Sequence, residues 1–304
     1  MLPLHIARAL QVAEETFAGG RDGKEKQRVT LALADALTCH VGAIAVAQYS
    51  QALLTGQVEP DPTLNRSLRS LRRVLPGQWL AWAARSLESV PAGPVSGLGE
   101  WYLRGDYAEA GAAYEALRRI MVLHLAYDGD YGSRQFVPPR ILLEMVDQYR
   151  IRRNKMPGQR TTDDGRRTTD DDLDEQVAAA LFPGLRALLD TATFLGEYQL
   201  YAPETRQLLM GVKPATPMPP MTVPVDLIGA ATMLLYPPGS APDYTKRPTL
   251  GDERLPIFPL DPLLVYIQCG QCDRYRVAAL NEVVNGTPTY RGLDPHCGHT
   301  EVRG

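Results

Sequence analysis

Apolar residues recur at spacings of three and four along the first two thirds of the chain. The pattern is clearest in HIARALQVAEETFA, in EKQRVTLALADALTCHVGAIAVAQYSQALL and in LNRSLRSLRRVL. This spacing places the apolar side chains on one face of an α-helix, and Gly and Pro fall mostly between such stretches. The pattern therefore predicts an all-α domain over residues 1–198.

Three further helices are predicted within this domain. The stretch LPGQWLAWAARSLESV, residues 75–90, begins with Pro76, a residue type favoured in the first turn of a helix. Its bulky apolar residues fall on one broad face, which we expect to be buried: Trp79, Leu80, Trp82 and Leu87. Two more helices are expected over residues 107–127 and 138–155.

Residues 158–175 have a different character from the helices around them. They contain RTTDD twice and almost no apolar residue. Burial cannot offset the entropy cost of ordering such a segment, so we predict a mobile acidic surface loop. Thr169 or Asp170 is expected to cap the helix that follows. Pro183 is expected to kink that helix or to split it in two.

After residue 198 the helical spacing is lost, and Pro and β-branched residues become frequent. Short candidate strands alternate there with turns rich in Pro and Gly. These strands are YQLYA, QLLMGV, MTVPVDLIGAATMLLY, PLLVYIQC, YRVAALNEVV and TPTYRG. We expect a smaller β-rich domain over residues 199–304, which makes the predicted fold class α+β.

Composition narrows the class of protein. A chain of 304 residues with 44% hydrophobic residues can bury a substantial core. No uninterrupted apolar run reaches the length of about 18 residues that is typical of a membrane helix, and the first residues lack the pattern of a signal peptide. We therefore expect a soluble, cytoplasmic protein without a membrane partner. The formal net charge of -3 gives no indication of a surface built to bind nucleic acid.

Three of the four cysteines gather near the C-terminus, as Cys269 and Cys272 in QCGQC and Cys297 in HCGH. A Cys-x-x-Cys turn holds two thiolates within reach of one tetrahedral zinc ion, with Zn–S bonds of about 2.3 Å. Cys297 and His299 supply a second pair of ligands. The spacing predicts a structural Zn²⁺ site made of these four residues.

Other interpretations of this cluster remain open. His296 competes with His299 as the fourth ligand, although Cys-Gly-His favours His299. The cluster is alternatively metal-free packing, or a redox-active pair, but a thioredoxin-like Cys-x-x-Cys opens a helix in a βαβ setting that this pattern lacks. The dipeptide Asn285-Gly286 predicts a hairpin between the two ligand pairs. Cys39 stands in an apolar stretch and is expected to be a core residue.

Basic and aromatic residues alternate around the same region. Such side chains either contact single-stranded nucleic acid or form the outward face of a hairpin, and the second interpretation is preferred. The residues are Arg274, Tyr275, Arg276, Tyr290 and Arg291.

The helix that ends in LLEMVDQYRIRRNK, followed by MPGQ, resembles the last helices of HEPN-type domains, which are all-α modules of bacterial signalling and anti-phage proteins. Their signature is Arg, a polar residue that is often Asn, and a His a few residues later. Arg153 and Asn154 match the first half. In members that cleave RNA, the Arg positions charge and the His shuttles a proton. Here Gly158 or Gln159 stands at the His position, and neither does acid–base work near neutral pH.

Two observations qualify this resemblance. His124 is a candidate substitute for the missing histidine, although a His beside Met121 and Val122 is more typical of a packed helix. The basic end of the helix, including Arg153, also suits a solvated C-terminus that interacts with the helix dipole.

The resemblance implies a dimerisation or sensing module. We therefore expect a non-catalytic interaction or regulatory protein of a bacterial defence or signalling system, which assembles with a protein partner or as a homodimer. The alternative is a nucleic-acid-binding or RNA-cleaving effector that uses Arg153 and Asn154 with a histidine not yet identified.

Overall fold

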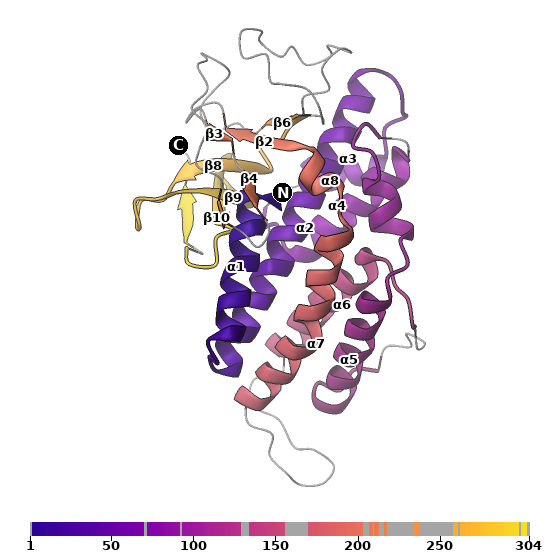
Figure 1. The fold of residues 1–304 in the computed structure, drawn as a ribbon. Coiled ribbons are helices and arrows are strands. Elements are labelled where there is room, and N and C mark those ends of the chain that lie inside the picture. Colours follow the sequence, from indigo (N-terminus) through magenta and orange to yellow (C-terminus); the bar gives the residue numbers. More distant parts are fainter. Residues whose placement is uncertain are drawn as a thin grey trace. The chain divides into compact units, whose positions relative to one another are not determined.

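The structure is a computed structural model. It describes residues 2–69, 72–91, 93–128, 134–155, 170–202, 207–208, 210–212, 216–217, 234–236, 258–260, 262–297 and 299–302. Within these residues the first part is mainly helical, and a small antiparallel sheet lies near the C-terminus (Figure 1). The predicted α+β class is confirmed.

The chain forms two compact units that interleave along the sequence. The first consists of Met1–Gln11, Asp35–Gly99 and Thr193–Gly304, and the second of Val12–Ala34 and Glu100–Ala192. The C-terminal sheet thus belongs to the same unit as the first residues of the chain. The domain boundary expected after residue 198 stays a prediction.

The helices follow the apolar pattern closely. They are α1 (Leu4–Ala18), α2 (Gly23–Leu54), α3 (Pro62–Arg69), α4 (Pro76–Ser89), a π-helical turn η1 (Glu100–Arg104), α5 (Ala108–His124), α6 (Pro139–Lys155), α7 (Asp170–Thr191) and α8 (Phe194–Glu197). In α4, Pro76 opens the helix and the predicted inner face, with Trp79 and Trp82, is buried. The expected helices over residues 107–127 and 138–155 are α5 and α6.

α2 lies largely in the protein interior. By length and composition it is apolar enough to cross a membrane, and 83% of its most apolar window is buried inside the protein. A buried core helix of a globular protein has the same properties. Gly42 illustrates the packing, because a Cβ at this position would lie 2.8 Å from Cε3 of Trp79 on α4.

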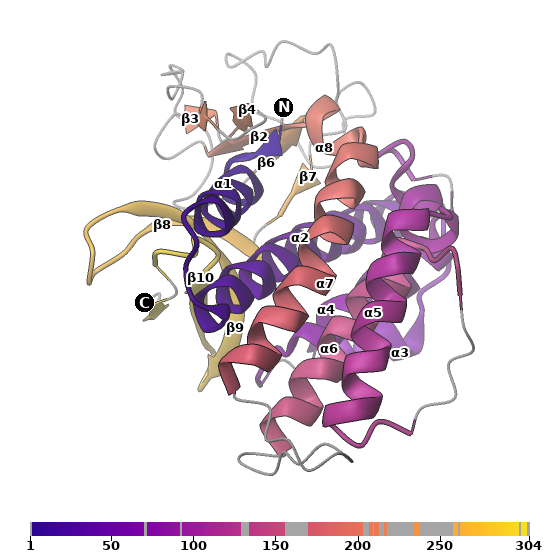
Figure 2. The ribbon, with the colours of Figure 1, turned by 60° about the horizontal axis from the view of Figure 1, so that its bottom comes forward.

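In the second unit α5 packs against both α6 and α7 (Figures 1 and 2). A Cβ on Gly184 would lie 2.5 Å from the Cβ of Ala113, so a glycine allows α7 to approach α5 closely. Phe17 of α1 stacks on Phe182 of α7, with 4.5 Å between the ring centroids.

The prediction of a loop over residues 158–175 is wrong for its last part. Asp170–Glu175 form the first turns of α7, and the preceding residues 156–169 lie outside the described residues. Asp171 Oδ1 accepts a hydrogen bond of 3.1 Å from the backbone N of Lys24. Glu175 forms an ion pair of 2.7 Å with Lys26. These contacts with α2, the acidic side chains at a helix N-terminus and the burial of Leu173 together stabilise a segment that is otherwise polar.

Pro183 does not split α7, which is continuous from Asp170 to Thr191. A proline inside a helix leaves the carbonyl four residues earlier without its usual donor. Here both Pro183 and Ala179, which carries that carbonyl, are exposed, so water can bind the carbonyl.

In the first unit the C-terminal sheet has the strand order β11-β10-β9-β8, and all its neighbours are antiparallel. Its strands are β8 (Leu264–Gln268), β9 (Tyr275–Val284), β10 (Thr287–Gly292) and β11 (Thr300–Val302). Asn285 and Gly286 form the turn between β9 and β10, with φ of 50° and 82°. Positive φ at both positions is typical of a tight hairpin turn, and the predicted hairpin is confirmed.

Shorter strands complete the described β structure. They are β1 (Leu2–Pro3), β2 (Gln199–Ala202), β3 (Gln207–Leu208), β4 (Met210–Val212), β5 (Thr216–Pro217), β6 (Leu234–Tyr236) and β7 (Phe258–Pro259), in sheets of order β1-β4-β5 and β3-β2-β6-β7. The start of the chain therefore pairs with a strand some two hundred residues later.

Two histidines are buried together in the first unit. His5 of α1 and His40 of α2 are 2% and 1% exposed, and their ring centroids lie 5.0 Å apart. Within the described part of the chain, both ring nitrogens of His5 and Nδ1 of His40 have no hydrogen-bond partner. Burial lowers the pKa of His40 to about 3, and burial together with His40 lowers the pKa of His5 well below its usual value.

This pair predicts that the protein loses stability in mild acid. Below the unfolded pKa of about 6.5, the unfolded histidines bind protons while the folded ones stay neutral. The free energy of unfolding is therefore highest above this pH and falls as the pH decreases below it. Between pH 7.5 and 5 we expect a loss of about 2 kcal/mol from His40 and a further loss from His5.

Urea unfolding at both pH values, with a chelator present so that no metal contributes, measures this loss. His40→Leu should remove the contribution of His40, about 2 kcal/mol. An equal loss in the variant and the wild type would show that other groups cause the pH dependence.

Candidate metal centre

Four potential ligands converge at one end of the C-terminal sheet. Cys269 and Cys272 lie in the tight turn between β8 and β9. Cys297 and His299 lie in the connection from β10 to β11. Because β8, β9 and β10 are antiparallel neighbours, the β8–β9 turn and the β10–β11 connection lie at the same end of the sheet. The structure thus brings together the four residues predicted from the sequence.

The ligand atoms are close enough to share one metal ion. All four lie within 4.8 Å of one another. His299 Nδ1 is 3.4 Å from Cys269 Sγ and 3.3 Å from Cys297 Sγ, and the Sγ atoms of Cys272 and Cys297 are 3.0 Å apart. Two sulfurs on a tetrahedral zinc ion lie about 3.8 Å apart, given Zn–S bonds of about 2.3 Å. Small rotations of the side chains therefore suffice to hold an ion.

The Cys-x-x-Cys turn is built to stabilise a thiolate. The backbone N–H groups of Gln271 and Cys272 both point to Cys269 Sγ, at 3.4 Å each. Asp273 has a positive φ of 54°, and its N–H donates to the carbonyl of Cys269 at 2.9 Å. Backbone donors favour the charged form of the acceptor they contact. Cys269, which is fully buried, is therefore prepared to bind a cation.

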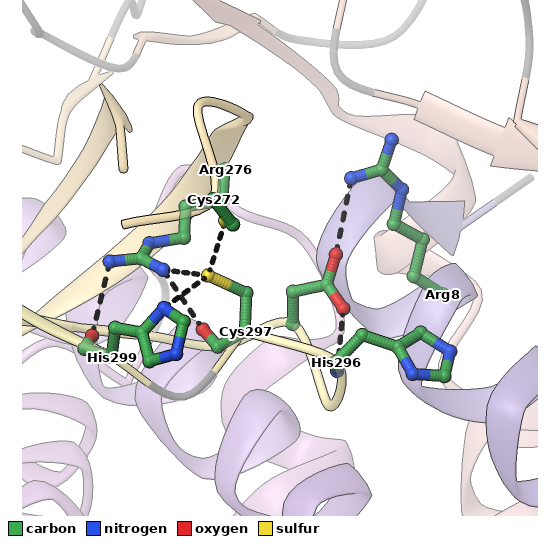
Figure 3. Close-up of polar contacts among 7 residues, drawn as sticks. Arg8, Cys272, Arg276, His296, Cys297 and His299 are labelled. Atoms are coloured by element: carbon green, nitrogen blue, oxygen red, sulfur yellow. Dashed lines mark hydrogen bonds and ion pairs between the residues drawn. The ribbon is translucent and has the colours of Figure 1, made fainter. Parts of the chain in front are cut away.

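Arg276 adds a positive charge beside the ligands. Its side chain is only 2% exposed. The guanidinium donates to Cys297 Sγ and, at 3.1 Å each, to the carbonyl oxygens of Cys297 and His299 (Figure 3). Three thiolates and a divalent cation together carry one negative charge, which a buried guanidinium offsets. Arg276 thus lies directly beside the four candidate ligands.

The protonation of Cys297 couples metal binding to pH. Burial and hydrogen bonds to Cys272 and Cys269 raise the pKa of the Cys297 thiol to about 12, while the Arg276 guanidinium acts in the opposite direction. Without a metal, Cys297 therefore keeps its proton at neutral pH. A metal ion must displace this proton in order to bind, because the thiolate is the ligand.

His296, the competing candidate, is not part of the group. It is exposed, and its backbone N donates to Asp294 Oδ1 at 2.9 Å. Figure 3 shows its imidazole apart from the cluster. His299 is therefore the histidine that joins the three cysteines. Cys39 is buried in α2, as expected of a core residue.

The basic and aromatic residues near the cluster do not form a common outward face. Arg276 and Tyr290 are buried, and Arg291 forms an ion pair of 3.4 Å with Asp35 of α2. Only Arg274 and Tyr275 of this set are exposed. The burial of Arg276 beside the cysteines was not predictable from the sequence, because the position of a residue in a strand does not show which face of the sheet is covered.

The candidate HEPN residues lie at the end of α6, and an ion pair engages the arginine. Arg153 Nη2 lies 3.5 Å from Asp174 Oδ1 and 3.9 Å from Asp170 Oδ2, both on α7. Asn154 is exposed. His124, the proposed substitute for the missing histidine, is half-buried at the end of α5. The positions at which the family has its histidine, Gly158 and Gln159, lie outside the described residues.

Asp174 is a residue that the sequence did not single out. Its side chain is 6% exposed and accepts a hydrogen bond of 2.6 Å from Gln27 of α2. Gln27 also contacts the hydroxyl of buried Tyr149 at 2.6 Å. Burial is the main reason why the pKa of Tyr149 is raised to about 12. Together with Arg153 these residues form a polar cluster that links α2, α6 and α7. In the sequence, this polar cluster is indicated only by an acidic residue at a position of α7 that faces the interior.

No known family profile, curated protein or solved structure matches this chain.

Proposed function

We propose that this protein is a non-catalytic interaction or regulatory protein whose C-terminal sheet is held together by one structural zinc ion. The observation that carries the proposal is the closed set of four ligands, Cys269, Cys272, Cys297 and His299. Three sulfurs and one imidazole suit a soft, tetrahedral ion such as Zn²⁺. Four protein ligands leave no open position for a substrate or water, so such an ion stabilises the fold and does not act as a catalyst.

Contacts between the sheet and the helices of the same unit support a structural role. Asp294, between β10 and β11, forms an ion pair of 3.3 Å with Arg8 of α1 (Figure 3). The segment before α4 extends the sheet, because Val74 N donates to Asn281 O at 2.7 Å and Val283 N donates to Arg72 O at 3.0 Å. An ion at this end of the sheet would therefore also stabilise the contacts that the sheet makes with α1 and with the segment before α4.

For the helical part we propose a HEPN-like dimerisation or sensing module in a cytoplasmic bacterial defence or signalling protein. Two observations favour assembly over catalysis. Arg153 is engaged by carboxylates of α7. In addition, Val122 and Leu123 of α5 are 47% and 68% exposed, and Ile151 of α6 is 39% exposed. Apolar side chains of this size at a surface are suited to contact with a second copy or another protein.

Elemental analysis of the purified protein by mass spectrometry tests the zinc proposal. We expect about one zinc ion per chain, as a single four-ligand site requires. Cys269→Ser should lose the metal, and Cys39→Ser is the matched control because Cys39 is buried away from the ligands and should leave the metal content unchanged. Zinc-free wild-type protein, or equal zinc in both variants, would contradict the proposal.

The alternative function, an RNA-cleaving effector, makes the opposite prediction for Arg153. It requires metal-independent cleavage of RNA that Arg153→Ala abolishes. The interaction protein should leave RNA intact with either residue at this position.

A further inference from the structure

The three cysteines of the metal centre differ in exposure. Cys269 is fully buried and Cys297 is 5% exposed, whereas Cys272 is partly exposed. Oxidation by a solute requires that the solute reach the sulfur, so access from solution decides which of the three cysteines reacts first. An oxidant from solution therefore reaches Cys272 more readily than the other two sulfurs.

The distances between the sulfurs also indicate which cysteine would form a disulfide with Cys272. The Sγ atoms of Cys272 and Cys297 are 3.0 Å apart, which is closer than the separation of about 3.8 Å that a tetrahedral zinc ion imposes. A disulfide needs a further approach of about 1 Å. Cys269 Sγ is instead held by the backbone N–H groups of Gln271 and Cys272. Cys297 is thus better placed than Cys269 to react with Cys272.

We propose that Cys272 is an oxidation site for hydroperoxides and that its oxidation produces a Cys272–Cys297 disulfide, which opens the metal centre. The formation of the disulfide does not depend on zinc being the native ion. The release of metal rests on the proposed function.

The chemistry proceeds in two balanced steps. The Cys272 thiolate attacks the peroxide, so that an S–O bond forms, the O–O bond breaks, and the other oxygen leaves as an alcohol or water after protonation. The Cys297 sulfur then attacks the sulfur of the Cys272 sulfenic acid and the S–S bond forms, while the leaving hydroxide takes up a proton, which the Cys297 thiol supplies where no metal holds it as a thiolate, and departs as water. The two sulfurs lose two electrons in total, and the peroxide gains them.

Arg276 favours the second step. Its guanidinium donates to Cys297 Sγ, so it is placed to stabilise the negative charge of the attacking thiolate after the Cys272 sulfur has been oxidised. Once both sulfurs are joined, only Cys269 and His299 remain as ligands. Two ligands do not hold zinc in a structural site, so the ion leaves.

Peptide mapping after oxidation tests this inference. The Cys39→Ser protein, as purified, is treated with hydrogen peroxide, alkylated without reduction, and digested with trypsin. Cys269 and Cys272 then lie on the peptide of residues 255–274, and Cys297 on the peptide of residues 292–303. We expect these two peptides to be cross-linked, with Cys269 alkylated, and one metal ion to be released for each disulfide formed.

Two other results would overturn the inference. One is a disulfide within residues 255–274, between Cys269 and Cys272, and the other is Cys272 oxidised to sulfinic acid without any cross-link. Elemental analysis of the same untreated sample separates this question from the proposed function. A metal-free protein that still forms the Cys272–Cys297 disulfide would contradict the zinc proposal alone, whereas a zinc-loaded protein with another disulfide would contradict the inference alone.

Discussion

Loss of the metal is expected to lower the thermal unfolding midpoint by about 10 °C. A ligand that binds only the folded state stabilises it by about 4 kcal/mol when its concentration is a thousand times its Kd. For chains of about 150–250 residues, each kcal/mol corresponds to about 2–4 °C. The effect is large because Cys269 and Cys297 are buried. Without an ion, three thiols and an imidazole remain at this end of the sheet, and the metal–ligand bonds that stabilise it are lost.

Differential scanning calorimetry of the zinc-loaded protein, the chelated protein and Cys269→Ser measures this shift. Cys39→Ser should respond to chelation as the wild type does, since it retains all four ligands. Hydrogen exchange then locates the effect: amides of β8, β9 and β10 should lose protection on chelation, whereas those of α5 and α7 should keep it. If chelation changes neither the midpoint nor the protection of the sheet, the cluster is ordinary core packing.

Replacement of Asp174 by Ala is expected to lower the free energy of unfolding by about 3 kcal/mol. Asp174 is buried and accepts from Gln27 and Arg153, so its removal takes one acceptor from each of these two donors. Breaking a buried charge pair costs about 3–5 kcal/mol. Arg153 is partly exposed and keeps a contact with Asp170, which places the expected loss at the lower end.

A double-mutant cycle distinguishes a structural Arg153 from a catalytic one. We expect Arg153→Ala alone to cost about 1–2 kcal/mol, and the double variant with Asp174→Ala to cost about 1 kcal/mol less than the sum of the two. Arg104→Ala is the control, because Arg104 pairs with Glu100, their side chains are 73% and 71% exposed, and such surface pairs contribute less than about 1 kcal/mol.

Urea unfolding of the four proteins gives the energies, and an RNA-cleavage assay on the same samples gives the activity. Strictly additive losses would show that Arg153 and Asp174 do not stabilise each other. RNA cleavage by the wild type that disappears in Arg153→Ala would instead assign the arginine to an active site.

The sequence by itself determined the elements that depend on near neighbours. The three- and four-residue spacing of apolar side chains defined α4, α5 and α6 within a few residues, and Pro76 marked the start of α4. Asn285-Gly286 defined the hairpin, since few other dipeptides adopt two positive φ angles. The grouping of the four candidate ligands was also predictable, because the two pairs, Cys269 with Cys272 and Cys297 with His299, each lie within one short stretch of chain.

Only the tertiary structure decided the features that join distant parts of the chain. Asp170–Glu175 are helical because residues of α2 bond to them, although their own composition favours a loop. Arg276 is buried because the turn that carries Cys297 and His299 folds over it. Arg153 acquired its partner because the tertiary structure places the end of α6 next to the start of α7. In each case the deciding interaction comes from a residue far away in the sequence, and no local pattern of propensity or hydrophobicity records such a contact.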